Sequence, residues 1–166
     1  YGYAEVLIEK GLAYVCTCPR ESFHRLVGRG EPCPHRSAEP LPNIEMWRRM
    51  LRGEFGQGEA VVRVKTELDH PNPAVRDWPA LRVDKSPHPR VGRRFYVWPL
   101  YNWSCAIDDH EMRVSHVIRG KEHLTNELRQ SYVFNYLGWV QPVGIHYGRI
   151  KPVSYTHLRA HETGRN

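Results

Sequence analysis

The sequence predicts a mixed α/β protein, and three observations support this class. Residues 114–120, 122–139 and 143–150 read as strand, helix and strand, which is the order of a βαβ unit with a parallel sheet. Residues 11–91 alternate between short strands and one amphipathic helix, which is typical of an α+β region. Hydrophobic residues make up 40% of the 166 residues, enough to build a core.

The chain opens with the predicted end of a helix. Residues 1–10 place apolar side chains at helical spacing, and Gly11 follows as a stop signal. Residues 12–18, LAYVCTC, then read as a short strand that leads into a cysteine-rich loop.

A clear helix is predicted within residues 41–58. Asn43 can cap its first turn, and Gly53 can end it. One face of this helix would carry Ile44, Trp47 and Leu51.

Two strands follow this helix. Residues 59–65 are rich in β-branched side chains, and residues 80–84 have a similar composition. The proline-punctuated residues 68–79 are predicted to be the loop between them. Residues 86–94 form a basic, proline-rich connection.

The second half begins with an aromatic strand over residues 94–103. Residues 108–112 are expected to begin a short helical turn, and residues 114–120 to form a strand of the buried type. The helix over residues 122–139 ends at Gly138. Its stripe at i+4 steps consists of Leu124, Leu128, Tyr132 and Tyr136.

These elements divide the chain into parts. We expect residues 1–10 and residues 92–151 to belong to one α/β body, with residues 11–91 inserted between them as an α+β unit. Residues 152–166 show no periodicity and no apolar face, and they resemble a translated cloning adaptor, so we expect them to lie outside the fold.

Charge and hydropathy limit the possible surroundings of the protein. A formal net charge of +6 and a pI near 9.3 suit a polyanionic partner, although an ordinary basic surface would give the same values. The basic residues 46–52 and 86–94 could contact phosphates or simply face water. No apolar run approaches the roughly 18–20 residues of a membrane span, and no signal peptide opens the chain. We expect a cytoplasmic protein without membrane contact.

Four side chains that can bind metals occur in two close pairs, Cys16 with Cys18 and Cys33 with His35. Two short pairs can supply the four tetrahedral ligands of a closed, structural zinc site, which leaves no position for a catalytic water. One alternative is three buried cysteines and an exposed histidine. Another is a nucleophilic Cys16 or Cys18 that uses His24 or His35 as its base.

Three polar residues lie where predicted elements end. Tyr101 follows the aromatic strand, and Arg119 and Glu122 flank the junction between a strand and a helix. Ligands of open parallel sheets bind at the carboxyl ends of strands, so these side chains could hold a small zwitterionic acid. A surface Arg–Glu pair beside a packing tyrosine is the alternative.

Several segments resemble one enzyme family. Residues 98–139, WPLYNWSCAIDDHEMRVSHVIRGKEHLTNELRQSYVFNYLGW, and residues 145–150, IHYGRI, resemble the second half of the catalytic domain of glutamyl-tRNA synthetases of the archaeal and eukaryotic-like branch. Residues 53–83 are similar to the acceptor-stem-binding insertion of that family, and residues 3–18 to the segment before it. The resemblance covers residues 1–151.

This resemblance implies a class I aminoacyl-tRNA synthetase with a Rossmann-like catalytic domain. Such an enzyme uses ATP and Mg²⁺ to form glutamyl-adenylate and then esterifies the 3′ end of tRNA. In the family motif, the tyrosine that matches Tyr101 lines the amino-acid pocket, and the arginine that matches Arg119 pairs with the side-chain carboxylate of the substrate. Glu122 matches the same strand end, and Cys105 lies in the turn that faces the pocket. Family members often carry a zinc knuckle, which here would hold a piece that meets the tRNA acceptor end.

Arg119 favours glutamate over glutamine as the substrate. A buried carboxylate needs a cation, and a guanidinium can bind it with two hydrogen bonds, whereas an amide would leave the charge unpaired. Two alternatives remain open: a glutaminyl-tRNA synthetase, and a non-catalytic, zinc-dependent tRNA-binding module.

Two signatures of the family are missing from the sequence. A His-rich ATP motif would precede Tyr1, and a Lys-Ser loop would follow soon after Ile150. We therefore expect a fragment without catalytic residues of its own, and we expect the 166-residue polypeptide alone to be inactive.

Overall fold

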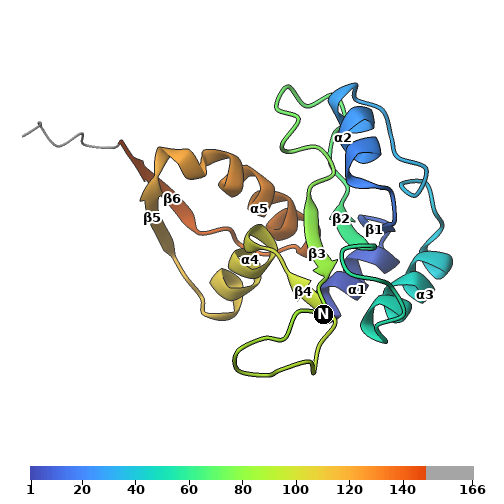
Figure 1. The fold of residues 1–166 in the computed structure, drawn as a ribbon. Helices are drawn as coiled ribbons and strands as arrows, with labels where there is room; N and C mark the ends of the chain where they lie inside the picture. The colour runs from blue at the N-terminus through green and yellow to red at the C-terminus, as the bar shows by residue number, and fades with distance from the viewer. Residues whose placement is uncertain (149–166) are drawn as a thin grey trace, which may run out of the picture.

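The computed structural model describes residues 1–148 of the chain (Figure 1). Its helices are α1 (Gly2–Glu9), α2 (Arg20–Gly28), α3 (Pro40–Leu51), α4 (Tyr101–Glu111) and α5 (Leu124–Leu137), with a 3₁₀ turn η1 (Lys121–His123). Its strands are β1 (Ala13–Cys16), β2 (Val61–Val64), β3 (Pro79–Val83), β4 (Val97–Pro99), β5 (His116–Gly120) and β6 (Val143–Tyr147). The expected tail at 152–166 lies outside the described residues. Within residues 1–148, no helix has both the length and the apolar character that crossing a membrane requires.

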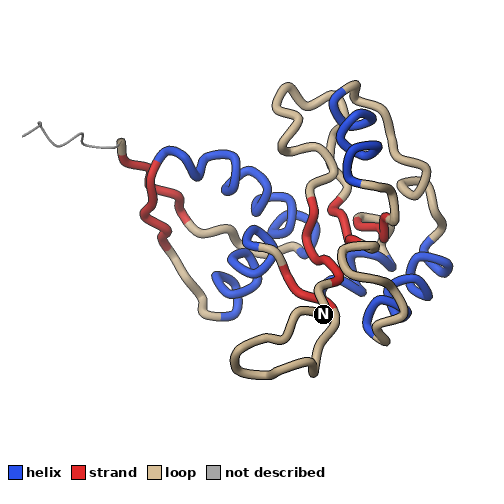
Figure 2. The backbone as a smooth tube through the Cα atoms, in the orientation of Figure 1, coloured by secondary structure: helices blue, strands red, loops and turns tan. Residues whose placement is uncertain are grey.

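Strands β1 to β4 form an antiparallel sheet in sequence order, seen at the centre of Figure 2. Ala13 lies opposite Val64, and Leu81 lies opposite Pro99. The register between β2 and β3 shifts after Val62, which indicates a β-bulge. The strands predicted at 12–18, 59–65 and 80–84 are therefore confirmed.

Both faces of strand β1 are buried, but against different layers. Ala13 and Val15 face the main core, which also contains side chains of α1 and α3. Tyr14 and Cys16 face a smaller cluster with Phe23, on α2. This alternation follows from the two-residue period of a strand, and it places the cysteine-rich loop over one face of the sheet.

Strands β5 and β6 pair in parallel, with Ile118 opposite Ile145. Helix α5 connects them, so the predicted βαβ unit is confirmed (Figure 1). The expectation that residues 114–120 form a buried strand is wrong, because Ile118 is 68% exposed. Helices α4 and α5 cover one face of the pair, and none of the described residues covers the other.

The helix predicted within 41–58 is present, but its start differs from the prediction. Helix α3 begins at Pro40 in the N1 position, where a missing N–H costs nothing. Asn43 is therefore not the cap. It is buried inside the helix, where its Oδ1 accepts a hydrogen bond from the Val15 N–H at 2.9 Å. Gly53 ends the helix as predicted, with a φ of +74° and Tyr96 pressed against its Cα.

The region around residue 100 is more helical than expected. The aromatic strand is limited to β4, which ends at Pro99, and Tyr101 already begins α4. Residues 108–112 therefore end a helix and do not begin one. In α5, the buried face is Gln130, Val133 and Phe134, so the predicted i+4 stripe is wrong in its first half: Leu124 and Leu128 are exposed.

The division of the chain at residues 10 and 91 stays a prediction. Strand β4 lies beyond residue 91 and yet completes the sheet that β1 begins. The main core likewise joins the two parts, because Trp103 and Phe134 pack in the same cluster as Val62.

Candidate metal centre and amino-acid site

The four predicted metal ligands meet at one end of β1. Cys16 ends that strand, Cys18 precedes α2, and Cys33 and His35 return from the loop after α2. Their ligand atoms all lie within 4.8 Å of one another, with Cys16 and Cys33 buried and the other two partly exposed. The 14 residues between the pairs hold helix α2, which is longer than the single helical turn that the sequence indicated.

The spacing of these atoms fits a tetrahedral ion. Zinc–sulfur bonds of about 2.3 Å place two thiolates about 3.8 Å apart. The Sγ atoms of Cys16 and Cys33 are 3.8 Å apart, and Cys18 Sγ is 3.3 Å from Nδ1 of His35. The cluster could therefore hold zinc without rearrangement of the backbone.

Thr17 fixes the orientation of the His35 ring. Its Oγ1 lies 3.0 Å from Nε2 of His35 and can accept the proton of that nitrogen. Nδ1 then keeps its lone pair and faces the cysteines. Sequence reasoning missed this residue, although a hydroxyl between two ligand positions is a usual outer partner of a metal-bound histidine.

The thiols of Cys16 and Cys33 are hydrogen-bonded to each other. Their hydrogen bond lowers the pKa of Cys16 to about 7, and Arg63 acts in the same direction. The same hydrogen bond, together with burial, raises the pKa of Cys33 to about 12. A metal ion would take the place of the proton in this hydrogen bond and bind both thiolates.

The nucleophile alternative has little support. His35 lies close enough to Cys18 to act as a base, but burial raises the pKa of the Cys18 thiol. A catalytic cysteine needs a stabilised thiolate instead. Cys16 is almost completely buried, so a substrate could not reach it.

A buried polar network joins the cluster to the sheet. The Tyr14 hydroxyl donates to Asp77 at 2.8 Å and lies 3.5 Å from Cys33 Sγ. Asp77 also accepts from the Arg36 guanidinium at 2.9 Å and from the Thr66 N–H at 3.0 Å. The loop that supplies the third and fourth ligands is therefore anchored to the segment just after β2 and to the segment before β3.

The second predicted group comes together at the start of α4 and the end of β5. Burial raises the pKa of Tyr101, with Cys105 acting in the same direction and the nearby Arg119 guanidinium opposing it. Burial also raises the pKa of Cys105, which lies one helical turn after Tyr101 and interacts with the same guanidinium. Tyr101, Cys105 and Arg119 are therefore neighbours.

A residue of α5 holds the Arg119 side chain in place. Its Nη2 donates to Oε1 of the buried Gln130 at 3.1 Å, and its Nε is buried without a hydrogen-bond partner among residues 1–148. Burial raises the pKa of Asp109, while Arg119 lowers it, so this carboxylate faces the guanidinium as well. Sequence reasoning did not identify Gln130. A polar residue on the same helix face as Val133 and Phe134 could have indicated a buried polar contact.

Glu122 lies on η1, beyond the end of β5. Its carboxylate folds back over Gly120, where a Cβ atom would be 2.3 Å from Oε2. The neighbouring His123 ring lies 6.0 Å from the Tyr101 ring, so η1 borders the same group.

The space beside these residues is open. The cavity that Arg119 lines with Asp109 and Gln130 has a volume of only about 10 Å³, too small for an amino acid. Tyr101 is 51% exposed. A ligand of Arg119 would therefore lie on the solvent side, next to Tyr101.

The arginines at the end of α3 and directly after it do not form a free basic face. Each is paired with a glutamate on the surface, as Arg48–Glu5, Arg49–Glu54 and Arg52–Glu45. These pairs support the simpler interpretation of residues 46–52 as a face turned to water.

A family model described as "tRNA synthetases class I (E and Q), catalytic domain" matches residues 1–160. The chain belongs to this family. The match confirms the predicted fold class and the resemblance on which it was based. It also runs nine residues past the predicted end of the fold at 151, and the origin of residues 152–166 stays a prediction.

Within this synthetase family, the chain is similar to archaeal proteins. The glutamate–tRNA ligase of Pyrococcus horikoshii is 58% identical over 151 residues, which cover 90% of this chain and 26% of that protein. The glutamate–tRNA ligase of Pyrobaculum calidifontis is 53% identical over 154 residues, which cover 91% of this chain and 27% of that protein. The chain thus spans about a quarter of the length of these relatives.

A solved structure shares the fold. The glutamate tRNA ligase of Elizabethkingia meningosepticum, in complex with its amino acid, superposes with a TM-score of 0.53 at 20% identity. The superposition covers 97% of this chain and 36% of that one.

Proposed function

We propose that this synthetase chain belongs to a glutamate–tRNA ligase. Such a ligase joins glutamate to ATP as glutamyl-adenylate, with release of pyrophosphate, and then transfers the glutamyl group to the 3′ end of tRNA, with release of AMP. The archaeal relatives support this activity at 50–58% identity. ATP and Mg²⁺ are the cofactors that such a reaction requires.

The observation that carries the proposal is the position of Arg119. Its Nη2 is bonded to Gln130, which fixes the guanidinium beside the half-exposed Tyr101, where an anion can reach it from the solvent side. We propose that it binds the side-chain carboxylate of glutamate, with Tyr101 and Cys105 beside the substrate and Glu122 at the edge. An amide would leave this charge unpaired, which is the basis of discrimination against glutamine.

Asp109 makes this pairing selective. In the absence of substrate, its carboxylate is a counter-charge near Arg119, because the guanidinium acts to lower the pKa of Asp109. A bound glutamate would compete for the same guanidinium, and only an anionic side chain can do so effectively. Asp109 is thus proposed to hold Arg119 in place until the substrate arrives.

We further propose that Cys16, Cys18, Cys33 and His35 bind a structural Zn²⁺. Their donor set and distances support this, because three thiolates and an imidazole fill a tetrahedral shell. The ion would hold the loop around α2 against the sheet. That loop belongs to the insertion at residues 11–91, which is proposed to meet the acceptor stem of tRNA.

The test is ATP–pyrophosphate exchange with tRNA present. Residues 1–151 of this chain replace the segment that they match in the Pyrococcus horikoshii ligase, and glutamate and glutamine are compared as substrates. Exchange with glutamate alone is expected. Exchange with glutamine would move the assignment to a glutaminyl-tRNA synthetase. No exchange with either, together with zinc-dependent binding of tRNA, would favour a non-catalytic module.

A further inference from the structure

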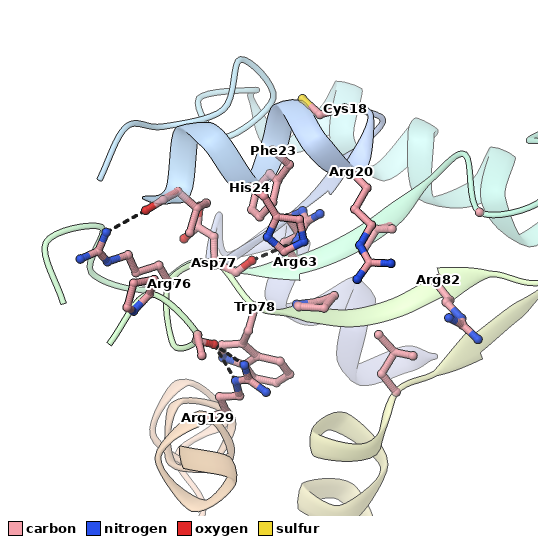
Figure 3. Close-up of a pocket in the computed structure, with 17 residues that line it drawn as sticks. Cys18, Arg20, Phe23, His24, Arg63, Arg76, Asp77, Trp78, Arg82 and Arg129 are labelled. Atoms are coloured by element: carbon pink, nitrogen blue, oxygen red, sulfur yellow. Dashed lines mark hydrogen bonds between the residues drawn. The ribbon is translucent and has the colours of Figure 1, made fainter. Parts of the chain in front are cut away.

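A cavity of about 510 Å³ opens between α2, the β2–β3 pair and the loop before β3 (Figure 3). It includes neither Tyr101 nor Arg119, so it is distinct from the proposed amino-acid site. Arg20 and His24 reach it from α2, Arg82 from β3 and Arg129 from α5. Its volume falls in the range of about 300–1,000 Å³ that is usual for small-ligand sites.

The lining of this cavity is strongly cationic. Five arginines line it, and the only carboxylate among the lining residues is Asp77. Asp77 is 1% exposed and is already paired with Arg36. The cavity therefore concentrates positive charge without an anion of its own to balance it.

Two of the arginines serve the structure. Arg76 donates to the carbonyls of Val27 and His70 at 2.7 Å, and Arg129 donates to the carbonyl of Ala74 at 2.7 Å. Carbonyl groups satisfy the N–H donors of these side chains but do not neutralise their charges. Both arginines thus hold the rim together and still attract an anion.

Two further arginines are free to bind a ligand. Arg20 makes no hydrogen bond or ion pair with any residue among 1–148 in the structure. Within residues 1–148, the Arg82 guanidinium makes one ion pair, with the Asp84 carboxylate at 3.3 Å on the surface. Figure 3 shows Arg20 extending from α2 toward the sheet, with Arg82 further along on β3.

The floor of the cavity contains donors without acceptors. Arg63 is 8% exposed and lies 3.3 Å above the Phe23 ring, and its Nε has no partner among the described residues. The indole Nε1 of Trp78, in the same wall, is equally unpartnered and buried. Protein atoms cover both of these nitrogens, so what the floor offers a ligand is the positive charge of Arg63.

We infer that this cavity binds the phosphate of an unpaired RNA nucleotide, held by Arg20 and Arg82 at the rim and Arg63 at the floor. The inference rests on the proposed function, which supplies tRNA as the partner. A cavity of this size admits a single nucleotide from an unpaired strand, whereas a base-paired nucleotide remains within its helix. Arginine planes and the exposed His24 ring provide stacking surfaces for the base.

The metal cluster and the cavity share a wall. Cys18 lines the cavity, and α2 begins only two residues later, at Arg20. A metal ion at the cluster would therefore fix the start of the helix that presents Arg20 and His24. Arg63 also lies near the thiols of the cluster, so it is unsuitable for a clean test of RNA binding.

The test uses the 166-residue chain and a fluorescein-labelled single-stranded RNA, followed by anisotropy at several salt concentrations. The double variant Arg20→Ala/Arg82→Ala removes the two rim contacts. The matched control is Arg25→Ala/Arg29→Ala, which removes the same charge from exposed positions on and after α2 that do not line the cavity. Circular dichroism confirms that both double variants fold like the parent.

The rim variant is expected to bind the RNA at least about tenfold more weakly at ~0.1 M salt. The slope of log K against log salt should fall by about 0.7, because the two arginines hold one phosphate and each phosphate contact on a single strand contributes about 0.7. The control should keep the slope of the parent. Equal losses in both variants, no binding by the parent chain, or tighter binding of a duplex of the same sequence would each overturn the inference.

The RNA-binding test and the exchange assay of the proposed function can fail independently of each other. If the exchange assay fails while the rim variant alone loses RNA binding, the cavity is an RNA site and the ligase assignment is wrong. If exchange succeeds while the rim variant binds RNA as the control does, the ligase assignment stands and the cavity inference is wrong.

Discussion

The two sheets of the molecule differ in how their apolar side chains are covered. Every residue of β1 is buried, and β2 is buried at three of its four positions. In the β5–β6 pair, by contrast, four large apolar side chains on one face are exposed by 45–68%, namely Ile118, Val143, Ile145 and Tyr147. The sequences of the two sheets are similarly rich in β-branched residues, so composition does not explain the difference.

The layers packed on each sheet explain it. Helices α1 and α3 cover one face of the antiparallel sheet, and α2 with the cysteine loop covers the other. The second of these layers is small, which is why a metal ion would matter there. On the β5–β6 pair, residues 1–148 place helices against one face and leave the other uncovered. The sequence of a strand thus predicts which of its side chains are apolar. Whether those side chains are buried depends on the layers packed against the sheet.

The largest expected loss of stability follows from a substitution in the main core. Trp47→Ala removes a side chain that is fully buried on α3, so the free energy of unfolding should fall by about 3–5 kcal/mol. Ile118→Ala, on the open face, should change it by less than about 0.5 kcal/mol. Urea unfolding of both variants measures the contrast, and equal losses would show that the open face is covered in solution.

The second effect tests the small layer beneath the cysteine loop. Zinc at about 100–1,000 times its dissociation constant would stabilise the chain by about 3–4 kcal/mol. Cys33→Ser should abolish zinc binding and this stabilisation, whereas Cys105→Ser, outside the cluster, should keep both. Elemental analysis and thermal unfolding provide the readouts. A zinc-free parent chain, or metal loss in both variants, would argue against the site.

A smaller loss of stability is expected where α3 is hydrogen-bonded to β1. Asn43→Ala leaves the buried N–H of Val15 without its acceptor and should cost about 1–3 kcal/mol. The control is Asn135→Ala on the exposed side of α5, which should be nearly neutral. If both variants unfolded alike, the link between α3 and β1 would not stabilise the fold.

The smallest effect on stability concerns the open face itself. Ile118→Lys should leave the free energy of unfolding within about 0.5 kcal/mol and raise the solubility of the chain, because it interrupts an exposed apolar patch. Solubility is measured by precipitation with polyethylene glycol, and stability by urea unfolding. A loss of more than about 2 kcal/mol would contradict the exposure of this face.

The sequence was most informative where the signal was local. The Cys16–Cys18 and Cys33–His35 spacing correctly predicted that four ligand atoms meet, because short loops can bring close pairs together. Gly11, Gly53 and Gly138 correctly predicted helix ends, since each adopts a positive φ that other residues avoid.

The errors arose where tertiary contacts decided the outcome. Asn43 has the chemistry of a helix cap, but Pro40 starts the helix earlier and a partner on β1 uses the amide. Tyr101 and Trp103 favour strands by propensity, yet Pro99 ends the strand and helix α4 packs against α5. The cationic cavity had no sequence signal, because its five arginines come from four separate elements and the loop before β3.

The most direct test of the proposed recognition of glutamate is Arg119→Cys in the Pyrococcus horikoshii ligase that carries residues 1–151 of this chain. The Michaelis constants for glutamate and ATP are compared in pyrophosphate exchange, with the exposed Arg113→Cys as the matched control. The loss of a paired buried charge should raise the glutamate value by about 30-fold or more, with the ATP value and the control nearly unchanged. Equal increases for glutamate and ATP would contradict the role of Arg119.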